Sequence, residues 1–218
     1  MKDKRKIFFT SLLTILLIFS NIVVSKITVV ANLPLSCSIF IYPFTFLCIT
    51  IIADLYGAKE AMKSVAYAII CQILVFILCT VIANLPNQVD TLMQANALQS
   101  LLAPELTNGI YHPNFTIMIG TLLSFGISQL INIGLYTLAK KYTFKVVSSA
   151  LAILFAFVID TVLFNVIKSI GVTNNNFTLT IINQFVVGVV ITVISVILFC
   201  IFTAGSNKTK KLNTKKED

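Results

Sequence analysis

Six long apolar stretches constrain the fold of this chain more than any other feature of its sequence. They run at about residues 7–27, 36–56, 64–83, 115–138, 146–170 and 177–203. A helix of about 20 apolar residues spans the hydrocarbon layer of a membrane. The stretches are too long for membrane β-strands and lack their alternation of polar and apolar residues. The sequence therefore predicts an all-α integral membrane protein, a six-transmembrane-helix bundle forming one membrane domain over residues 1–218.

The composition agrees with lipid as the solvent. Hydrophobic residues make up 57% of the chain and charged residues only 11%, whereas a soluble domain carries about 25% charged residues. A single water-facing globule cannot hide so much apolar surface, so we expect most of it to contact membrane lipid.

The basic residues predict the topology. Fourteen of the 16 Lys and Arg residues lie before the first stretch, between the second and third, between the fourth and fifth, or after the sixth. Basic loops stay in the cytoplasm, so we expect both termini to be cytoplasmic in a bacterial-type cell membrane. The net charge of +8 is then a topology signal, and we expect no nucleic-acid partner. The basic tail, residues 205–218, is expected to be disordered and to contact anionic lipid.

Patterns typical of enzymes and metal sites do not occur in the sequence. The single histidine, His112, lies between the third and fourth stretches, and no Gly-x-x-x-x-Gly-Lys-Ser/Thr phosphate loop is present. All five cysteines lie in apolar stretches without a CxxC pair, where Cys usually acts as a small hydrophobe. We expect no enzyme activity, no cofactor, no metal site and no structural disulfide.

Polar side chains inside the apolar stretches are the candidates for function. Asp160 lies near the middle of the fifth stretch, where an Asp costs about 2.5–3.5 kcal/mol on insertion scales, so a functional role is the default expectation. The alternative is a structural partner such as Lys168 or an amide of the first stretch. Asn21, Gln129 and Asn132 carry amide groups that are costly to leave unpaired in hydrocarbon.

The second stretch combines a helix break with a carboxylate. Pro43 interrupts the helix because proline lacks an N–H group and crowds a carbonyl, and broken helices with polar groups nearby are typical of transport sites. Thr50 lies one turn before Asp54 on the same face. We predict that Asp54 lines a cavity or a gate; the alternative is a water-exposed residue near Lys59 or Lys63.

Five segments occur in an order that is typical of one transporter family. They are SNIVVSKI (20–27), YPFTFLCITIIADLYGAKEA (42–61), NLP (84–86), SFGISQLINIGLY (124–136) and SSALAILFAFVIDTVLF (148–164). In these segments the chain resembles the YhhQ family of queuosine-precursor transporters, also called the vitamin uptake transporter family. The resemblance covers most of the chain. It implies a six-span importer of 7-deazaguanine compounds such as queuine, which are salvaged for tRNA modification.

The resemblance also implies positions for the site. The matching positions are Ser20, Asn21, Lys26, Tyr42, Pro43, Tyr56, Gly57, Gln129, Asp160 and Phe164. The chain departs from the family in having Thr50 and Asn132 at positions that are usually acidic, and Asp54 where Glu is common. Lys26 either belongs to the site or extends to the outer surface.

The chemistry of a 7-deazaguanine fits these residue types. Its amino-pyrimidinone edge offers a ring N–H and an amine, which one carboxylate can accept together. Amides can bind the carbonyl side, and aromatic rings can stack on the flat base. We expect Asp160 to be the principal acceptor. The candidate substrate-binding residues are Asp160, Asn21, Gln129, Asn132, Tyr42, Phe44, Thr50, Asp54, Phe164 and Lys26.

Three functions remain open on the sequence alone. The first is a stand-alone importer, whose partners are a purine-like small molecule and membrane lipid. The second is the substrate-binding subunit of an energy-coupling-factor vitamin transporter, which needs a partner membrane subunit and ATPases. The third is a non-transporting membrane assembly protein held together by polar helix faces. The coupling ion and the formation of a homo-oligomer are also left open.

Overall fold

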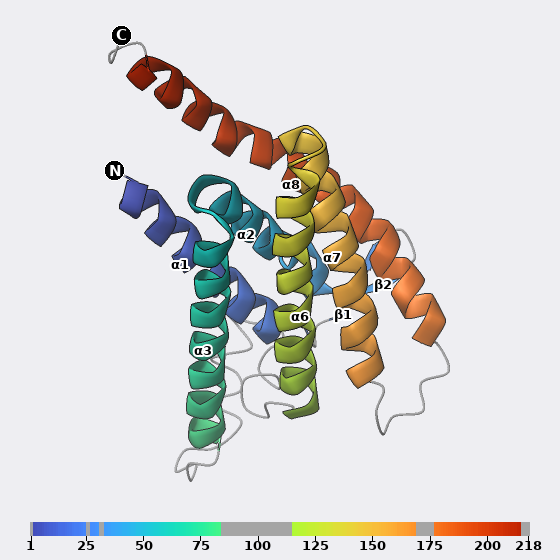
Figure 1. Ribbon diagram of the computed structural model, residues 1–218. Helices are drawn as coiled ribbons and strands as arrows, with labels where there is room; N and C mark the ends of the chain where they lie inside the picture. The colour runs from blue at the N-terminus through green and yellow to red at the C-terminus, as the bar shows by residue number, and fades with distance from the viewer. Residues whose placement is uncertain (1, 25–26, 31–32, 84–114, 169–176, 215–218) are drawn as a thin grey trace.

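Helices make up nearly all of the structure, a computed structural model that describes residues 2–24, 27–30, 33–83, 115–168 and 177–214 (Figure 1). The loop that contains His112 lies outside these ranges. The long helices are α1 (Lys2–Val23), α2 (Pro43–Tyr56), α3 (Ala58–Ala83), α6 (Phe115–Ala139), α7 (Lys145–Lys168) and α8 (Phe177–Thr214). Within the described residues, six segments are long and apolar enough to cross a membrane. The predicted number of spans is confirmed.

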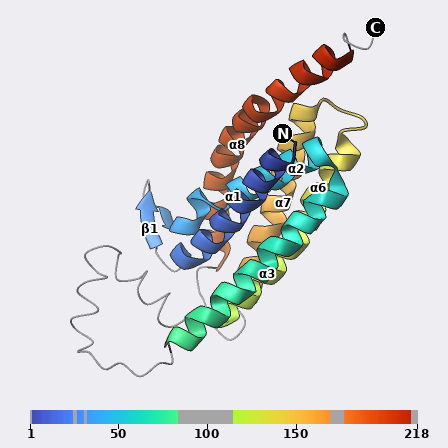
Figure 2. The same ribbon diagram turned by 90° about the vertical axis from the view of Figure 1, so that its left-hand side faces the viewer.

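A short β-hairpin follows α1, at the end of that helix away from the N-terminus (Figure 2). Its strands are β1 (Ile27–Val30) and β2 (Leu33–Ser36), which pair antiparallel with Ile27 opposite Ser36. The predicted first helix, 7–27, is therefore wrong at its end, because α1 stops at Val23. The hairpin has a local cause: the β-branched run from Ile27 to Val30 suits a strand better than a helix.

The second span is broken where the sequence predicts it. A 3₁₀ helix, η1 (Cys37–Phe40), ends before Tyr42, and Pro43 then occupies the first turn of α2. Proline suits this position because the first N–H groups of a helix have no partner within it. The break turns the chain so that the Tyr42 side chain enters the bundle, where only 8% of it is exposed.

Helix α2 forms the centre of the bundle. It contacts α1, α3, α6, α7 and α8, and every residue from Thr45 to Ala53 is buried. A helix that is apolar on most of its surface belongs in a protein core or in lipid, and here the other helices cover it. Helix α2 ends at Tyr56 and is followed by Gly57, whose φ of +91° favours glycine. This turn sends α3 back along the bundle.

Both ends of the chain lie on the same side of the bundle (Figures 1 and 2). This side holds the start of α1, the connections α2–α3 and α6–α7, and the end of α8 (Figure 1), and we call it the basic end. The helices extend further there than predicted. Helix α3 begins at Ala58 rather than at residue 64, and α8 continues to Thr214 through the tail that we expected to be disordered. The tail has no proline, and its commonest residue, lysine, is a good helix former. That this end is cytoplasmic stays a prediction from the charges.

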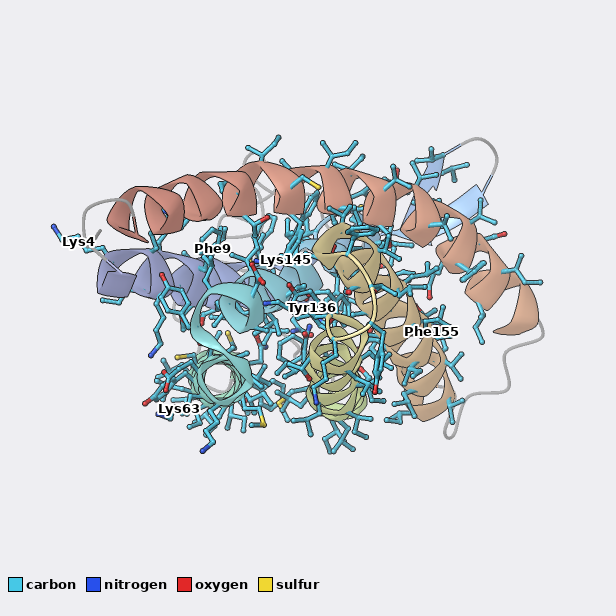
Figure 3. All side chains as sticks on the ribbon, turned by 45° about the horizontal axis from the view of Figure 1, so that its top comes forward. Lys4, Phe9, Lys63, Tyr136, Lys145 and Phe155 are labelled. Carbon is cyan, nitrogen blue, oxygen red and sulfur yellow. The ribbon has the colours of Figure 1, made fainter. Side chains whose placement is uncertain are left out.

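The outer surface of the bundle is strongly apolar. Large side chains are exposed along α3, α7 and α8, for example Ile70, Leu74, Phe155 and Ile197, and Figure 3 shows Phe155 pointing away from the bundle. Such a surface is unfavourable in water but suits contact with lipid chains. The structure is that of a multi-pass membrane protein.

Candidate functional site

A partly open pocket lies inside the bundle. About 480 Å³ of space, including some open solvent, is bounded by these side chains: Ser20, Asn21, Val24, Ser38, Ile39, Tyr42, Thr121, Ser124, Phe157, Asp160, Thr161, Phe164 and Gln184. They come from the late part of α1, η1, the start of α2, the early part of α6, the later half of α7 and the early part of α8. All of these lie away from the basic end of the bundle.

Asp160 is the acidic group of the pocket. Its Oδ1 accepts a hydrogen bond from the Tyr42 hydroxyl at 2.9 Å and one from Ser128 Oγ at 3.0 Å. Neither bond uses Oδ2. The side chain is only 6% exposed, and in the described part of the chain it forms no ion pair with a Lys or Arg. A buried carboxylate with only neutral partners can accept further hydrogen bonds from a ligand.

Two more predicted site residues share this pocket with Asp160 and Tyr42. Asn21 reaches it from α1, and Phe164 from α7, one turn beyond Asp160. The Asn21 amide donates to the backbone oxygen of Leu17 at 3.0 Å. That bond uses one of its two N–H groups and leaves its oxygen available. Phe164 provides an aromatic surface on the same side as the carboxylate.

Gln184, on α8, is a pocket residue that the sequence analysis missed. Its Oε1 accepts a hydrogen bond at 2.8 Å from Asn165, on α7. The signal that could have found it is the one that singled out Gln129, a primary amide inside an apolar stretch. The hydroxyls of Ser38, Thr121 and Thr161 were also missed.

The other predicted amides form a separate buried cluster between α2 and α6. Asn132 donates to Gln129 Oε1 and to the backbone oxygen of Phe46, each at 3.2 Å, and accepts from Thr50 at 3.3 Å. Gln129 in turn donates to Thr45 at 3.4 Å. These side chains are almost fully buried and do not line the pocket. Thr50 and Asn132 are the two neutral residues at positions where the family usually has acidic ones. The structure shows them hydrogen-bonded to each other.

Asp54 lies near the basic end of the bundle in a charged cluster. Its side chain is only 2% exposed. It pairs with Lys140, with Lys145 at 3.2 Å, and accepts a hydrogen bond from the Tyr136 hydroxyl at 2.8 Å. Figure 3 shows Tyr136 and Lys145 near the middle of this end, whereas Lys4 and Lys63 lie toward its edge.

The partners of Asp54 differ from the alternative expectation. That alternative placed it in water near Lys59 or Lys63, but Lys63 pairs instead with Glu60, at 2.7 Å. The lysines that bind Asp54 come from the connection between α6 and α7 and from the start of α7. The cluster therefore joins three helices that are distant in sequence.

A layer of aromatic rings separates the pocket from the charged cluster. The Phe46 ring contacts those of Tyr42 and Phe157 edge to face, at 5.7 and 6.5 Å between centroids, and Phe125 packs against Tyr42 at 6.2 Å. The three phenylalanines are buried. Along α2 toward the basic end, Phe46 is followed by Thr50 of the amide cluster and then by Asp54. Several packed layers therefore separate the pocket from the basic end.

The two remaining predicted residues are not in the pocket lining. Phe44 is half-buried and packs against the hydrophobic core from α2. Lys26 lies outside the described residues. The structure thus brings together Asp160, Tyr42, Asn21 and Phe164, and it separates them from Gln129, Asn132, Thr50 and Asp54.

Six helices that are long and apolar enough to span a membrane, packed around a pocket with one buried carboxylate, define a multi-pass membrane protein with an internal pocket. The sequence profile of the family described as "Putative vitamin uptake transporter" matches residues 36–203. The chain belongs to this transporter family, which the resemblance of its segments had indicated. No curated protein and no solved structure matches the chain.

Proposed function

We propose that this protein imports queuosine precursors, 7-deazaguanine compounds such as queuine, across the cell membrane. The observation that carries the proposal is the Asp160 carboxylate, buried in the pocket with neutral partners only. An amino-pyrimidinone edge presents two adjacent N–H donors to such a carboxylate. Hydrogen bonds to an ionised acceptor contribute about 1.5–3 kcal/mol each.

The rest of the pocket supports a flat, polar ligand. Phe157 and Phe164 offer ring faces or edges for a planar base. Hydroxyl and amide groups on the other walls can bind its remaining polar atoms. Tyr42 holds Asp160 Oδ1 and so orients the carboxylate before the ligand arrives, which reduces the ordering cost of binding.

Transport further requires that the pocket reach each side of the membrane in turn. If the basic end is cytoplasmic, the pocket lies in the outer half and the packed layers close the inner half. In this proposal the aromatic layer and the charged cluster around Asp54 form the inner gate. Separation of Asp54 from Lys140 and Lys145 then accompanies release of the ligand into the cytoplasm.

Complementation tests the proposed function. The gene is expressed in a bacterium that cannot make queuosine precursors and lacks its own importer, queuine or a precursor is supplied, and queuosine in tRNA is measured. We expect modification to be restored, and lost again with Asp160→Asn at equal membrane levels. A host without energy-coupling-factor subunits also separates the stand-alone importer from a substrate-binding subunit. Unmodified tRNA despite confirmed membrane expression would overturn the substrate assignment.

A further inference from the structure

Two amides beside the pocket are held in one orientation by the backbone. Asn165 Nδ2 donates to the backbone oxygen of Thr161 at 2.7 Å and to Gln184 Oε1 at 2.8 Å. An amide nitrogen carries two protons, so these two bonds use both. Asn165 is only 6% exposed, which leaves little water to replace either bond.

The backbone oxygen of Thr161 decides which way both amides point. A carbonyl oxygen only accepts, so the Asn165 atom that faces it must be the nitrogen. Because that same nitrogen also faces Gln184, the Gln184 atom in contact must be its oxygen. Reversing either amide would place two donors or two acceptors against each other.

The Gln184 nitrogen therefore points away from Asn165. Gln184 lines the pocket, and its Nε2 makes no hydrogen bond to a residue that the structure describes. Two N–H donors on a half-buried side chain are thus available to a pocket ligand. Asp160, in the same pocket, offers the opposite chemistry, a carboxylate that accepts hydrogen bonds.

We propose that Gln184 is the specificity-determining donor that binds a carbonyl oxygen of the ligand, and that Asn165 is the positioning residue that holds it in this orientation. This inference rests on the proposed function and deepens it. The pocket selects a base that has N–H donors for Asp160 together with a carbonyl oxygen for Gln184. A base without that oxygen leaves the Gln184 donors unpaired, and one with an amino group in its place sets donor against donor.

Binding of two matched bases to the purified full-length protein tests this inference. The probes are 7-deazaguanine and its 6-thio analogue, which keeps the ring N–H and the amine for Asp160 but has sulfur, a weak hydrogen-bond acceptor, in place of the carbonyl oxygen. For the unchanged protein we expect the second base to bind about 10-fold more weakly, the size of a lost hydrogen bond that leaves its donor unpaired. Gln184→Leu should bring the ratio of the two dissociation constants close to one.

Gln72→Leu is the matched control. Gln72 is a buried glutamine on α3, outside the pocket lining, and its Oε1 has no hydrogen-bond partner among the described residues. The same substitution there should leave the ratio at about 10. Asn165→Leu frees the Gln184 amide to rotate, so we expect an intermediate ratio. A merely structural role of Asn165 would lower stability or weaken both bases equally and leave the ratio unchanged.

The outcomes separate the two proposals. If the unchanged protein binds neither base, the proposed function is overturned, and this inference with it. If it binds 7-deazaguanine but Gln184→Leu keeps the 10-fold ratio, the proposed function stands and the role of Gln184 is overturned. If Gln184→Leu removes the ratio and Asn165→Leu keeps it, Gln184 remains the donor and the positioning role of Asn165 is rejected.

Discussion

Tyr42 donates a hydrogen bond of 2.9 Å to Asp160, 118 positions later in the chain. The bond links the helix break at the start of α2 to the later half of α7. It joins the two features that sequence reasoning singled out separately, an interrupted helix and a carboxylate inside an apolar stretch. The break matters to the site because it brings a hydroxyl to the one acidic group of the pocket.

The first prediction concerns Asp160. Asp160→Asn keeps the shape of the side chain but replaces an anionic acceptor of two hydrogen bonds with a group that has one acceptor atom. Loss of one charge-assisted bond, about 1.5–3 kcal/mol, lowers the affinity for queuine about 10- to 150-fold. Affinity and melting temperature are measured on the same preparation.

Two results distinguish a binding role of Asp160 from a structural one. A binding role predicts weak affinity with a nearly unchanged melting temperature. Glu60→Gln, the matched control, lies outside the pocket and should keep normal affinity. Unchanged affinity in Asp160→Asn, with poor yield or a lower melting temperature, would remove Asp160 from the site.

The second prediction concerns the charged cluster as an inner gate. Asp54→Asn removes the charge that holds Lys140 and Lys145, so the basic end should open more often. In a chain without its native cysteines, Thr50→Cys reports this opening, because Thr50 is buried one turn before Asp54. We expect thiol labelling from the basic side to become several-fold faster when Asp54→Asn is added.

Glu60→Gln provides the control for the gate. Glu60 also pairs with two lysines, Lys6 and Lys63, but this cluster is more exposed and lies between α1 and α3. The same change from carboxylate to amide there should leave labelling at position 50 unchanged. Equal rates in Asp54→Asn and in the unchanged background would show that the Asp54 cluster does not close the path.

The third prediction concerns orientation and follows from the 14 basic residues on one side. Tyr142, in the turn between α6 and α7, is 80% exposed, and Val29, in β1, is 67% exposed. With single cysteines at these positions, an impermeant reagent should label Val29→Cys in intact cells and Tyr142→Cys only after permeabilisation. Labelling of Tyr142→Cys in intact cells would reverse the orientation.

The sequence could predict the features that depend on local composition. The number of spans follows from apolar runs, the break in the second span from Pro43, and the position of Asp160 inside the bundle from the cost of a charge in lipid. The β-hairpin was missed because it lies almost entirely between the first two predicted stretches, where the sequence analysis expected only a connection. Hydropathy measures lipid solubility and does not distinguish helix from strand over a few residues.

The sequence could not predict which polar groups satisfy one another. Gln129 and Asn132 were expected in the site because an amide in lipid needs a partner, and they find it in each other. Asp54 binds lysines about 90 positions away rather than its sequence neighbours. Such pairs are decided by how helices pack. Helix packing also places Gln184 in the pocket lining and Gln129 outside it.

The last prediction concerns the packing that shapes the pocket wall. A Cβ atom on Gly188 would lie 1.9 Å from Cε1 of Phe157, so only glycine lets α8 approach the ring that lines the pocket. Gly188→Ala must push the ring into the pocket or move α8 outward, and overpacking of this kind costs about 1–3 kcal/mol. Melting temperature and queuine affinity should both fall. Gly134→Ala is the control, because within the described residues its added Cβ would meet no atom within 4 Å apart from its own stretch of helix, and alanine favours a helix by up to about 1 kcal/mol. Adding Phe157→Leu to Gly188→Ala makes room for the methyl group and should recover part of the melting temperature. If Gly188→Ala alone melts like the unchanged protein, the close approach of α8 to Phe157 is not what holds this wall in place.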